Sequence, residues 1–204
     1  MTTLNRIVLI RHGETDGNSS LRFHGRGDVA LSDEGRGQMA AARLRLPGAS
    51  ACDRVVSSPM RRAWESACIV AKGHAIELEP DFREIDFGRW EGLSAVEIEA
   101  LDPILYTDWQ ARRDGFEFPD GERRAPFRAR VERGLTRLLA SGARSALVVA
   151  HKGVVRTIVE VLTQEALDAA HPTLGEVLQV TRAPDHTWKS GFHSSNPPAL
   201  EQLA

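Results

Sequence analysis

Near its start the chain reads Arg6-Ile7-Val8-Leu9-Ile10, and this apolar run passes directly into Arg11-His12-Gly13-Glu14. The run is compact and β-branched, which is typical of a strand buried on both faces of a sheet. Similar runs at residues 54–58 and 145–150 predict two more buried strands. Shorter runs at 75–78 and 177–181 predict two further strands.

Helical patterns lie between these strands. Ser32 is placed to cap a helix that runs to about Leu46, with Asp33 and Glu34 in the first turn, where the helix dipole favours acids. Pro59 opens a second helix, whose apolar positions recur at the three- and four-residue spacing of a core-facing stripe. These positions are Met60, Ala63, Trp64, Ala67, Cys68 and Ala71. Further helices are predicted over 127–139 and 153–162, and Pro103 starts or interrupts a helical stretch in the middle.

The alternation of strands and helices predicts an α/β fold. We expect a three-layer α/β/α sandwich around a mostly parallel sheet, because strand-helix-strand units pair in parallel and cover both sheet faces. Residues 1–183 are predicted to form a single domain. Residues 184–204 are polar and contain prolines, so we expect a loose C-terminal tail.

Composition narrows the classes of partner. The 204 residues carry a formal net charge of −2, so no overall basic field favours nucleic acid or an anionic membrane. The two cysteines, Cys52 and Cys68, do not make a secreted disulfide framework. No apolar run is long enough for a signal peptide or a membrane helix. We therefore expect a cytoplasmic protein, either a monomer or a homodimer.

Three of the predicted strands end in polar clusters. The first ends in Arg11-His12, the second leads through Ser57-Ser58-Pro59 to Arg61-Arg62, and the late one ends in His151-Lys152. In parallel sheets ligands sit beyond the carboxyl ends of the strands. Guanidinium groups and helix N-termini hold phosphoryl oxygens, and neutral imidazole can accept a phosphoryl group. Taken alone, a histidine or arginine after a strand is usually structural, but the combination predicts a phosphate site.

The clusters also resemble a known family. Leu9 to Thr15 with Asn18 is similar to the signature of the histidine phosphatase superfamily, also called the phosphoglycerate mutase-like family. Later blocks continue the resemblance in family order: 22–25, 28–38, 57–67, 83–92, 119–122 and 148–155. The resemblance spans residues 7 to about 160 and points to the phosphatase branch.

The resemblance implies roles for individual residues. His12 would be the nucleophile that becomes phosphohistidine, and Arg11 and Arg62 would hold the phosphoryl oxygens. His151 would complete the catalytic pocket and donate to the same oxygens. Asn18 would be a further substrate contact.

Two acidic residues receive different expectations. By resemblance Glu84 is the proton donor to the leaving oxygen and then the base that activates water, because an alkoxide leaves poorly unless it is protonated. Glu14 is interpreted as structural or orienting. An acceptor at one ring nitrogen of His12, such as a backbone carbonyl, is expected to fix its tautomer.

The chain departs from the family pattern at several positions. Lys152 follows the second histidine where many relatives have Gly, His24 stands where Gln is common, and Arg123 takes a place usually held by Ser. The positions considered as substrate contacts beyond the core set are Arg22, His24, Arg112, Arg113 and Lys152. For Lys152 and the pair 112–113 an outward, solvated orientation is an equal alternative.

The leading hypothesis is a metal-independent phosphomonoester phosphatase that needs no cofactor and acts on a small phosphorylated metabolite. The second hypothesis is a cofactor-dependent phosphoglycerate mutase, which shares the first steps of the reaction. The resemblance implies that a dedicated mutase would be a longer chain with an insertion in the middle region. The segment between Gly92 and Pro119 is short here. The third hypothesis is a non-catalytic module that binds a phosphorylated ligand. The sequence does not name the substrate.

Overall fold

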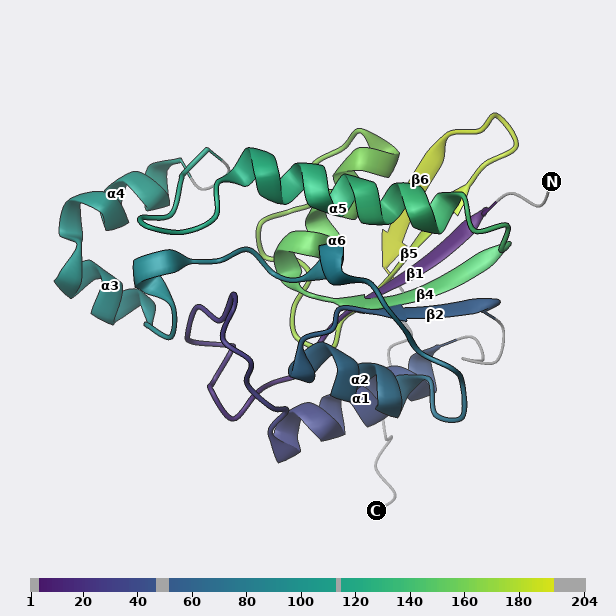
Figure 1. Ribbon diagram of the computed structural model, residues 1–204, viewed down its shortest axis with the longest axis horizontal. Coiled ribbons are helices and arrows are strands. Elements are labelled where there is room, and N and C mark those ends of the chain that lie inside the picture. The colour runs from purple at the N-terminus through teal and green to yellow at the C-terminus, as the bar shows by residue number, and fades with distance from the viewer. Residues whose placement is uncertain (1–3, 47–51, 113–114, 193–204) are drawn as a thin grey trace, which may run out of the picture.

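The computed structural model describes residues 4–46, 52–112 and 115–192, and a six-stranded sheet forms its centre (Figure 1). The strands are β1 (Arg6–Arg11), β2 (Arg54–Ser57), β3 (Glu77–Leu78), β4 (Ser145–Ala150), β5 (Val177–Arg182) and β6 (Trp188–Phe192). Their order across the sheet is β3-β2-β4-β1-β5-β6. Each of the five predicted strands is present within a few residues of its expected position.

The sheet is mostly parallel, as predicted, but one margin is antiparallel. β3, β2, β4 and β1 run in the same direction, whereas β5 pairs antiparallel with β1 and β6 antiparallel with β5. The reason is the return of residues 164–176 to the carboxyl edge of β1, where the Glu176 carbonyl accepts from Arg11 N–H at 3.4 Å. β5 therefore starts at the edge where β1 ends.

Helices cover both faces of the sheet, which confirms the mixed α/β architecture (Figure 1). One face carries α1 (Asp33–Arg45) and α2 (Arg61–Val70), and the other carries α5 (Arg124–Leu139) and α6 (Lys152–Thr163). The strand side chains alternate between the two layers: Val8 and Ile10 pack with the first helix pair, and Ile7 and Leu9 with the second. No helix in the described ranges is long and apolar enough to cross a membrane.

The chain between β3 and α5 makes an excursion away from the sheet (Figure 1). It contains the short 3₁₀ turns η2 (Pro80–Phe82) and η3 (Gly88–Trp90) and the helices α3 (Ala95–Leu101) and α4 (Pro103–Ala111). An aromatic cluster anchors it: Trp90 is fully buried and stacks on Phe116 with ring centroids 5.1 Å apart. Phe23, from the loop after β1, packs edge-on against Trp90 at 6.2 Å. These contacts join the excursion to the body of the protein.

The predicted helix signals are largely confirmed. The Ser32 hydroxyl accepts from Gly35 N–H at 3.1 Å and caps α1 as expected. The apolar stripe of α2 is wrong in part, because Trp64 is 46% exposed and Cys68 is only half-buried. The sheet contact of α2 is instead made by its smaller residues, including the fully buried Ala63 and Ala67.

Part of the loose tail that was expected from residue 184 is a strand in the structure. Trp188–Phe192 forms β6 and pairs with β5. The paired residues run from Arg182 opposite Trp188 to Leu178 opposite Phe192. The turn residues 183–187 that suggested a tail instead form a hairpin, in which Ala183 N–H donates to the Thr187 carbonyl at 2.8 Å. The remainder of the expected tail, residues 193–204, lies outside the described residues.

Candidate active site

The polar clusters after β1, β2 and β4 meet at the carboxyl edge of the sheet, as predicted. His12 N–H donates to the Ala150 carbonyl at 3.0 Å, and Ser58 N–H donates to the Val149 carbonyl at 3.0 Å. Both bonds extend the strand pairing by one step toward the site. The rings of His12 and His151 then lie side by side, with centroids 5.2 Å apart and planes at 64°. Four residues, His12, His151, Arg11 and Arg62, form what we call the histidine pocket.

The tautomer of His12 is fixed by its two hydrogen bonds. Nδ1 lies 2.8 Å from the Gly13 carbonyl, which can only accept. Nε2 lies 3.3 Å from Arg62 Nε, which can only donate. The proton therefore sits on Nδ1 and the lone pair on Nε2. The carbonyl acceptor that the sequence left unidentified is that of Gly13.

The surroundings keep His12 uncharged. The residue is buried, and burial is the largest cause that lowers its pKa well below 6.5, followed by the cations of Arg62 and Arg11. Both causes disfavour imidazolium because desolvation and like charge penalise the protonated form. His12 consequently presents an unprotonated ring nitrogen at neutral pH.

His151 is fully buried beside it, and burial also lowers its pKa well below 6.5, with the Arg62 cation as the next cause. Its Nε2 lies 2.8 Å from Ser58 Oγ, and Met60 N–H already donates to that hydroxyl at 3.3 Å. A hydroxyl proton directed at Nε2 would place the ring proton on Nδ1. Nδ1 is buried and has no hydrogen-bond partner among the described residues.

Arg62 is fully buried at the start of α2. Its terminal nitrogens donate to three backbone carbonyls of one loop, those of Gly27 at 2.7 Å and of His24 and Gly25 at 2.8 Å each. Nε is the atom directed at His12. Arg62 thus fixes the loop and the imidazole together, and its predicted hold on phosphoryl oxygens stays a prediction.

The same loop is held from its other side by Glu91, whose role the sequence did not reveal. The Glu91 carboxylate accepts from the backbone N–H groups of Gly25 at 3.1 Å, Arg26 at 3.0 Å and Phe87 at 2.9 Å. A carboxylate that accepts several backbone amides organises an irregular loop, as side chains do at helix caps. Glu91 lay within a block that was quoted for resemblance only.

Arg11 completes the histidine pocket. One terminal nitrogen donates to the Pro172 carbonyl at 3.0 Å, whereas Nε is buried without a hydrogen-bond partner among the described residues. Burial lowers the pKa of Arg11, and the nearby Glu84 carboxylate is the largest opposing cause. Burial likewise lowers the pKa of Arg62, and there too the Glu84 carboxylate is the largest opposing cause. Glu84 therefore lies close to both cations.

Glu84 lies in what we call the Glu84 segment, residues 79–92, and its side chain is buried. Oε2 accepts from Gly153 N–H in the first turn of α6 at 3.1 Å, and Oε1 accepts from Ile85 N–H at 3.0 Å. A Cβ on Gly153 would stand 2.5 Å from Glu84 Oε1, so the absence of a side chain there makes room for the carboxylate. The helix that follows His151 thereby positions Glu84.

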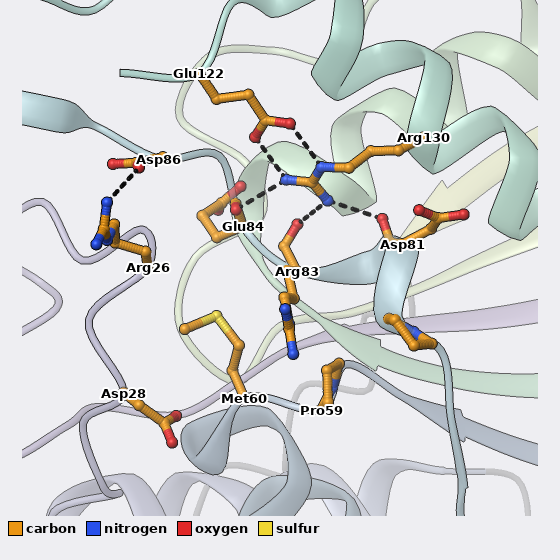
Figure 2. A pocket seen from close by; sticks show the side chains of 11 residues that line it. Arg26, Asp28, Pro59, Met60, Asp81, Arg83, Glu84, Asp86, Glu122 and Arg130 are labelled. Atoms are coloured by element: carbon orange, nitrogen blue, oxygen red, sulfur yellow. Dashed lines mark hydrogen bonds and ion pairs between the residues drawn. The ribbon is translucent and has the colours of Figure 1, made fainter. Parts of the chain in front are cut away.

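Arg130 of α5 holds the Glu84 segment by its backbone carbonyls, as Figure 2 shows. Its terminal nitrogens donate to the carbonyls of Asp81 at 2.8 Å, Arg83 at 2.6 Å and Glu84 at 2.9 Å. Glu122 binds the same guanidinium through both oxygens at 2.8 Å. The sequence offered no signal for this clamp, because Arg130 is one of several arginines on a polar helix face.

A cleft of about 550 Å³ opens beside Glu84 (Figure 2). Met60 and Pro59 of the turn between β2 and α2 line one side, and residues 80–86 line another. Its size falls within the usual range of small-molecule sites. Within the described residues, no group of three or more His, Cys, Asp or Glu side chains has a geometry that could hold a metal ion.

Glu14 is structural, as interpreted, since its carboxylate accepts from Thr15 N–H at 2.8 Å and Ser20 N–H at 3.2 Å. Asn18 occupies a left-handed turn with φ 57°, and its side chain is exposed. The substrate contact expected for Asn18 stays a prediction.

The remaining candidates lie at the periphery and have other partners. Arg22 pairs with Glu97 at 2.6 Å, His24 Nε2 contacts the Gly17 carbonyl at 2.6 Å, and Lys152 Nζ donates to the Ala170 carbonyl at 3.3 Å. Arg112 pairs with Asp108 on its own helix, Arg123 is exposed just before α5, and Arg113 lies outside the described residues. Their roles in substrate binding stay predictions.

Comparison with known proteins shows which proteins this chain resembles in sequence and in structure. The chain is 35% identical to a bifunctional protein of Mycobacterium tuberculosis over 84% of its own length, and it spans 47% of that relative. It is 31% identical to the adenosylcobalamin/alpha-ribazole phosphatase of Salmonella typhimurium, over 81% of this chain and 84% of that one. The native structure of mycobacterial glucosyl-3-phosphoglycerate phosphatase superposes with a TM-score of 0.77 at 27% identity, covering 92% of this chain and 97% of that one.

The chain spans about half the length of the first curated relatives it matches, with 47% of each covered. A family model, by contrast, matches most of this chain. The model of the histidine phosphatase superfamily (branch 1) matches residues 7–188, which include the histidine pocket and the Glu84 segment. The expectation drawn from the sequence is therefore confirmed, and the chain belongs to the histidine phosphatase superfamily, branch 1.

Proposed function

We propose that the chain hydrolyses a phosphomonoester through a phosphohistidine formed on His12. The observation that carries this proposal is the fixed tautomer of His12. Its Nδ1 proton is committed to the Gly13 carbonyl, and its Nε2 lone pair faces the guanidinium of Arg62. A nucleophile with a depressed pKa and a neighbouring cation is suited to attack phosphorus at neutral pH.

In the first step the Nε2 lone pair of His12 forms a bond to phosphorus while the ester P–O bond breaks. The leaving oxygen takes a proton from the carboxylic acid form of Glu84. An in-line transfer of this kind depends mainly on positioning and on neutralising the charge of the equatorial oxygens. Arg11 and Arg62 supply that charge.

In the second step Glu84, now a carboxylate, removes a proton from water. The water oxygen bonds to phosphorus and the P–N bond to His12 breaks, which releases inorganic phosphate. The reaction needs no metal in either step. Glu84 returns to its acid form after each turnover, as a general acid must.

Two buried polar atoms around the imidazole support a phosphoryl ligand. Arg11 Nε and His151 Nδ1 have no hydrogen-bond partner among the described residues, although buried polar groups are nearly always paired. Phosphoryl oxygens are strong acceptors, and they would satisfy both donors once the ester is bound.

Hydrolysis is favoured over transfer to a second sugar acid by the names of the relatives. The Salmonella relative is named adenosylcobalamin/alpha-ribazole phosphatase, and the mycobacterial one glucosyl-3-phosphoglycerate phosphatase. A small phosphorylated metabolite is therefore the substrate class that we propose. A phosphoglycerate mutase remains the alternative that the experiment below distinguishes.

The test uses the purified chain with p-nitrophenyl phosphate and, in parallel, 3-phosphoglycerate. His12→Asn is expected to lose at least about 10³-fold in kcat/KM and to yield no phosphoprotein by intact mass after rapid quenching. His74→Asn serves as the matched control, because His74 lies just after α2 and its ring nitrogen Nδ1 lies 3.3 Å from the Ala71 carbonyl, away from the residues of the histidine pocket. The wild type should retain turnover in EDTA.

Three outcomes would contradict the proposal. Full activity of His12→Asn would show that His12 is not the nucleophile. Isomerisation of 3-phosphoglycerate without net release of phosphate would identify a mutase. Phosphate release without any trapped phosphohistidine, in the wild type or in a Glu84→Gln variant impaired in dephosphorylation, would exclude the covalent route.

A further inference from the structure

The cleft beside Glu84 is rich in acidic side chains, and each of them is held by a partner. Asp86 accepts from Arg26 at 3.2 Å through one oxygen. Asp81 pairs with Arg133 at 3.2 Å and also with Arg137, which lies on the same helix. These carboxylates are therefore neutralised from within the protein.

The remaining acids of the cleft are bound as well. Glu122 forms a two-pronged pair with Arg130 at 2.8 Å, and both members are largely buried. Asp28 accepts from the backbone N–H of Arg61 at 2.7 Å. The acids of the cleft thus engage its cations Arg26 and Arg130, so neither is left as a free guanidinium.

Arg83 is different. Its side chain lines the cleft and is exposed, and it forms no hydrogen bond or ion pair with any described residue. Its backbone is rigid, because its carbonyl accepts from Arg130 at 2.6 Å. Figure 2 shows the side chain extending away from Arg130, toward Pro59 and Met60 on the opposite side of the cleft.

The position of Arg83 relates it to the leaving group. It directly precedes Glu84, whose carboxyl group turns inward to Gly153 while the guanidinium of Arg83 turns into the cleft. Glu84 itself lines this cleft, so a phosphomonoester whose bridging oxygen meets Glu84 can extend its leaving group into it. An anionic substituent there would meet a guanidinium fork that has no competing acid of its own.

We propose that Arg83 is a specificity-determining residue that binds a carboxylate on the leaving group of the substrate. This inference rests on the proposed phosphatase function. A carboxylate matches the two-pronged geometry of guanidinium and brings a single negative charge. A second phosphate would bring nearly two charges toward a cleft whose lining already holds more acids than arginines.

The test compares two esters that differ in a single group, 3-phosphoglycerate and glycerol 3-phosphate. The wild type is expected to favour the carboxylate-bearing ester in kcat/KM. Arg83→Gln should lower kcat/KM for 3-phosphoglycerate by about 10- to 100-fold, the usual contribution of a charge-assisted hydrogen bond. The ratio between the two esters should then approach one, and Arg83→Glu should reverse the preference.

The matched control is Arg128→Gln, which removes an exposed arginine of α5 that pairs with Glu132 and does not line the cleft. It should leave the selectivity ratio unchanged. A wild type that shows no preference for 3-phosphoglycerate, or an Arg83→Gln variant with the wild-type ratio, would overturn the inference. Trapping of phosphohistidine on His12 with either ester reports on the proposed function separately, so the two failures are distinguishable.

Discussion

The histidine pocket and the Glu84 segment supply two halves of one site by different structural means. The pocket is built on the ends of three adjacent parallel strands, and His12 and His151 are extensions of strand pairing. The Glu84 segment contains two short 3₁₀ turns and no long element. Its shape depends on the Arg130 side chain, which binds three of its carbonyls, and on Glu91, which links it to the loop at 24–27.

The two halves differ in what fixes the positions of their side chains. Strand ends are fixed by many weak backbone bonds, so no single side chain outside the pocket should decide their positions. A loop held by one guanidinium depends on that guanidinium, because a buried carbonyl that loses its donor is costly. Glu84, the proposed acid, should therefore be easier to displace by remote substitutions than His12, the proposed nucleophile.

Among substitutions that alter the Glu84 segment and leave the histidine pocket intact, Glu84→Gln is expected to cause the largest loss of activity. Because the amide cannot donate a proton to an alkoxide, kcat/KM for glycerol 3-phosphate should fall by about 10²- to 10⁴-fold. p-Nitrophenyl phosphate, whose leaving group departs without protonation, should still phosphorylate His12. Stopped-flow measurement should show a burst of p-nitrophenolate followed by slow turnover. Equal losses for both esters without a burst would show that Glu84 does not act as the acid.

Arg130→Met should have a smaller effect of the same character. The substitution removes the donors to the carbonyls of Asp81, Arg83 and Glu84, so the acid loses its fixed position while the histidine pocket stays intact. We expect a loss of about 10- to 100-fold in kcat/KM for glycerol 3-phosphate and a clearly smaller loss for p-nitrophenyl phosphate.

Arg133→Met is the matched control for this clamp. Arg133 lies on the same helix but is exposed, and among the described residues its side chain binds the carboxylate of Asp81 and no backbone carbonyl. Its substitution should leave the ratio of the two esters unchanged. A uniform loss of activity in Arg130→Met, accompanied by a lower melting temperature, would indicate a general structural role and contradict the comparison.

The smallest expected effect concerns pH and stability. Since burial lowers the folded-state pKa of His12 and His151 below 6.5, the unfolded chain takes up protons first as the pH falls. The stability contribution is complete above about pH 6.5 and is lost below it, by about 1.4 kcal/mol per pH unit for each histidine. Urea unfolding between pH 6.5 and 5 should give a shallower pH slope in His12→Asn than in the wild type.

His74→Asn provides the comparison for that measurement, because His74 is half-buried just after α2, at the opposite end of that helix from Arg62. Its slope should match that of the wild type. If His12→Asn also retained the full slope, His12 would have to take up a proton in the folded state. The view of the pocket as a site for neutral imidazole would then be wrong.

Sequence reasoning reached the two halves unequally. Apolar runs and helix signals placed His12, Arg62 and His151 at one sheet edge, because strand direction alone decides where those residues meet. Glu84 was assigned through resemblance, since no periodic pattern marks the irregular segment around it. The clamp by Arg130 and the bonds of Glu91 were missed, because a long-range bond from a side chain to a backbone carbonyl leaves no local sequence signal.

Where the sequence pattern was misleading, a tertiary contact decided the outcome. Trp64 fits the helical stripe, yet small alanines make the close approach of α2 to the sheet and leave the indole at the surface. The polar residues after 183 resemble a free end, yet Trp188–Phe192 finds a partner in β5. In both cases the deciding partner is distant in sequence.

The first turn of α6 joins the two halves in a single rigid element. His151 precedes the helix, and two positions later the backbone N–H of Gly153 grips the carboxylate of Glu84. The spacing between His151 and Glu84, the proposed acid, is thus set by one helical turn. Arg83 and Met60 line the cleft but are not part of this turn, so they could be exchanged to admit a different alcohol while the position of Glu84 stayed unchanged.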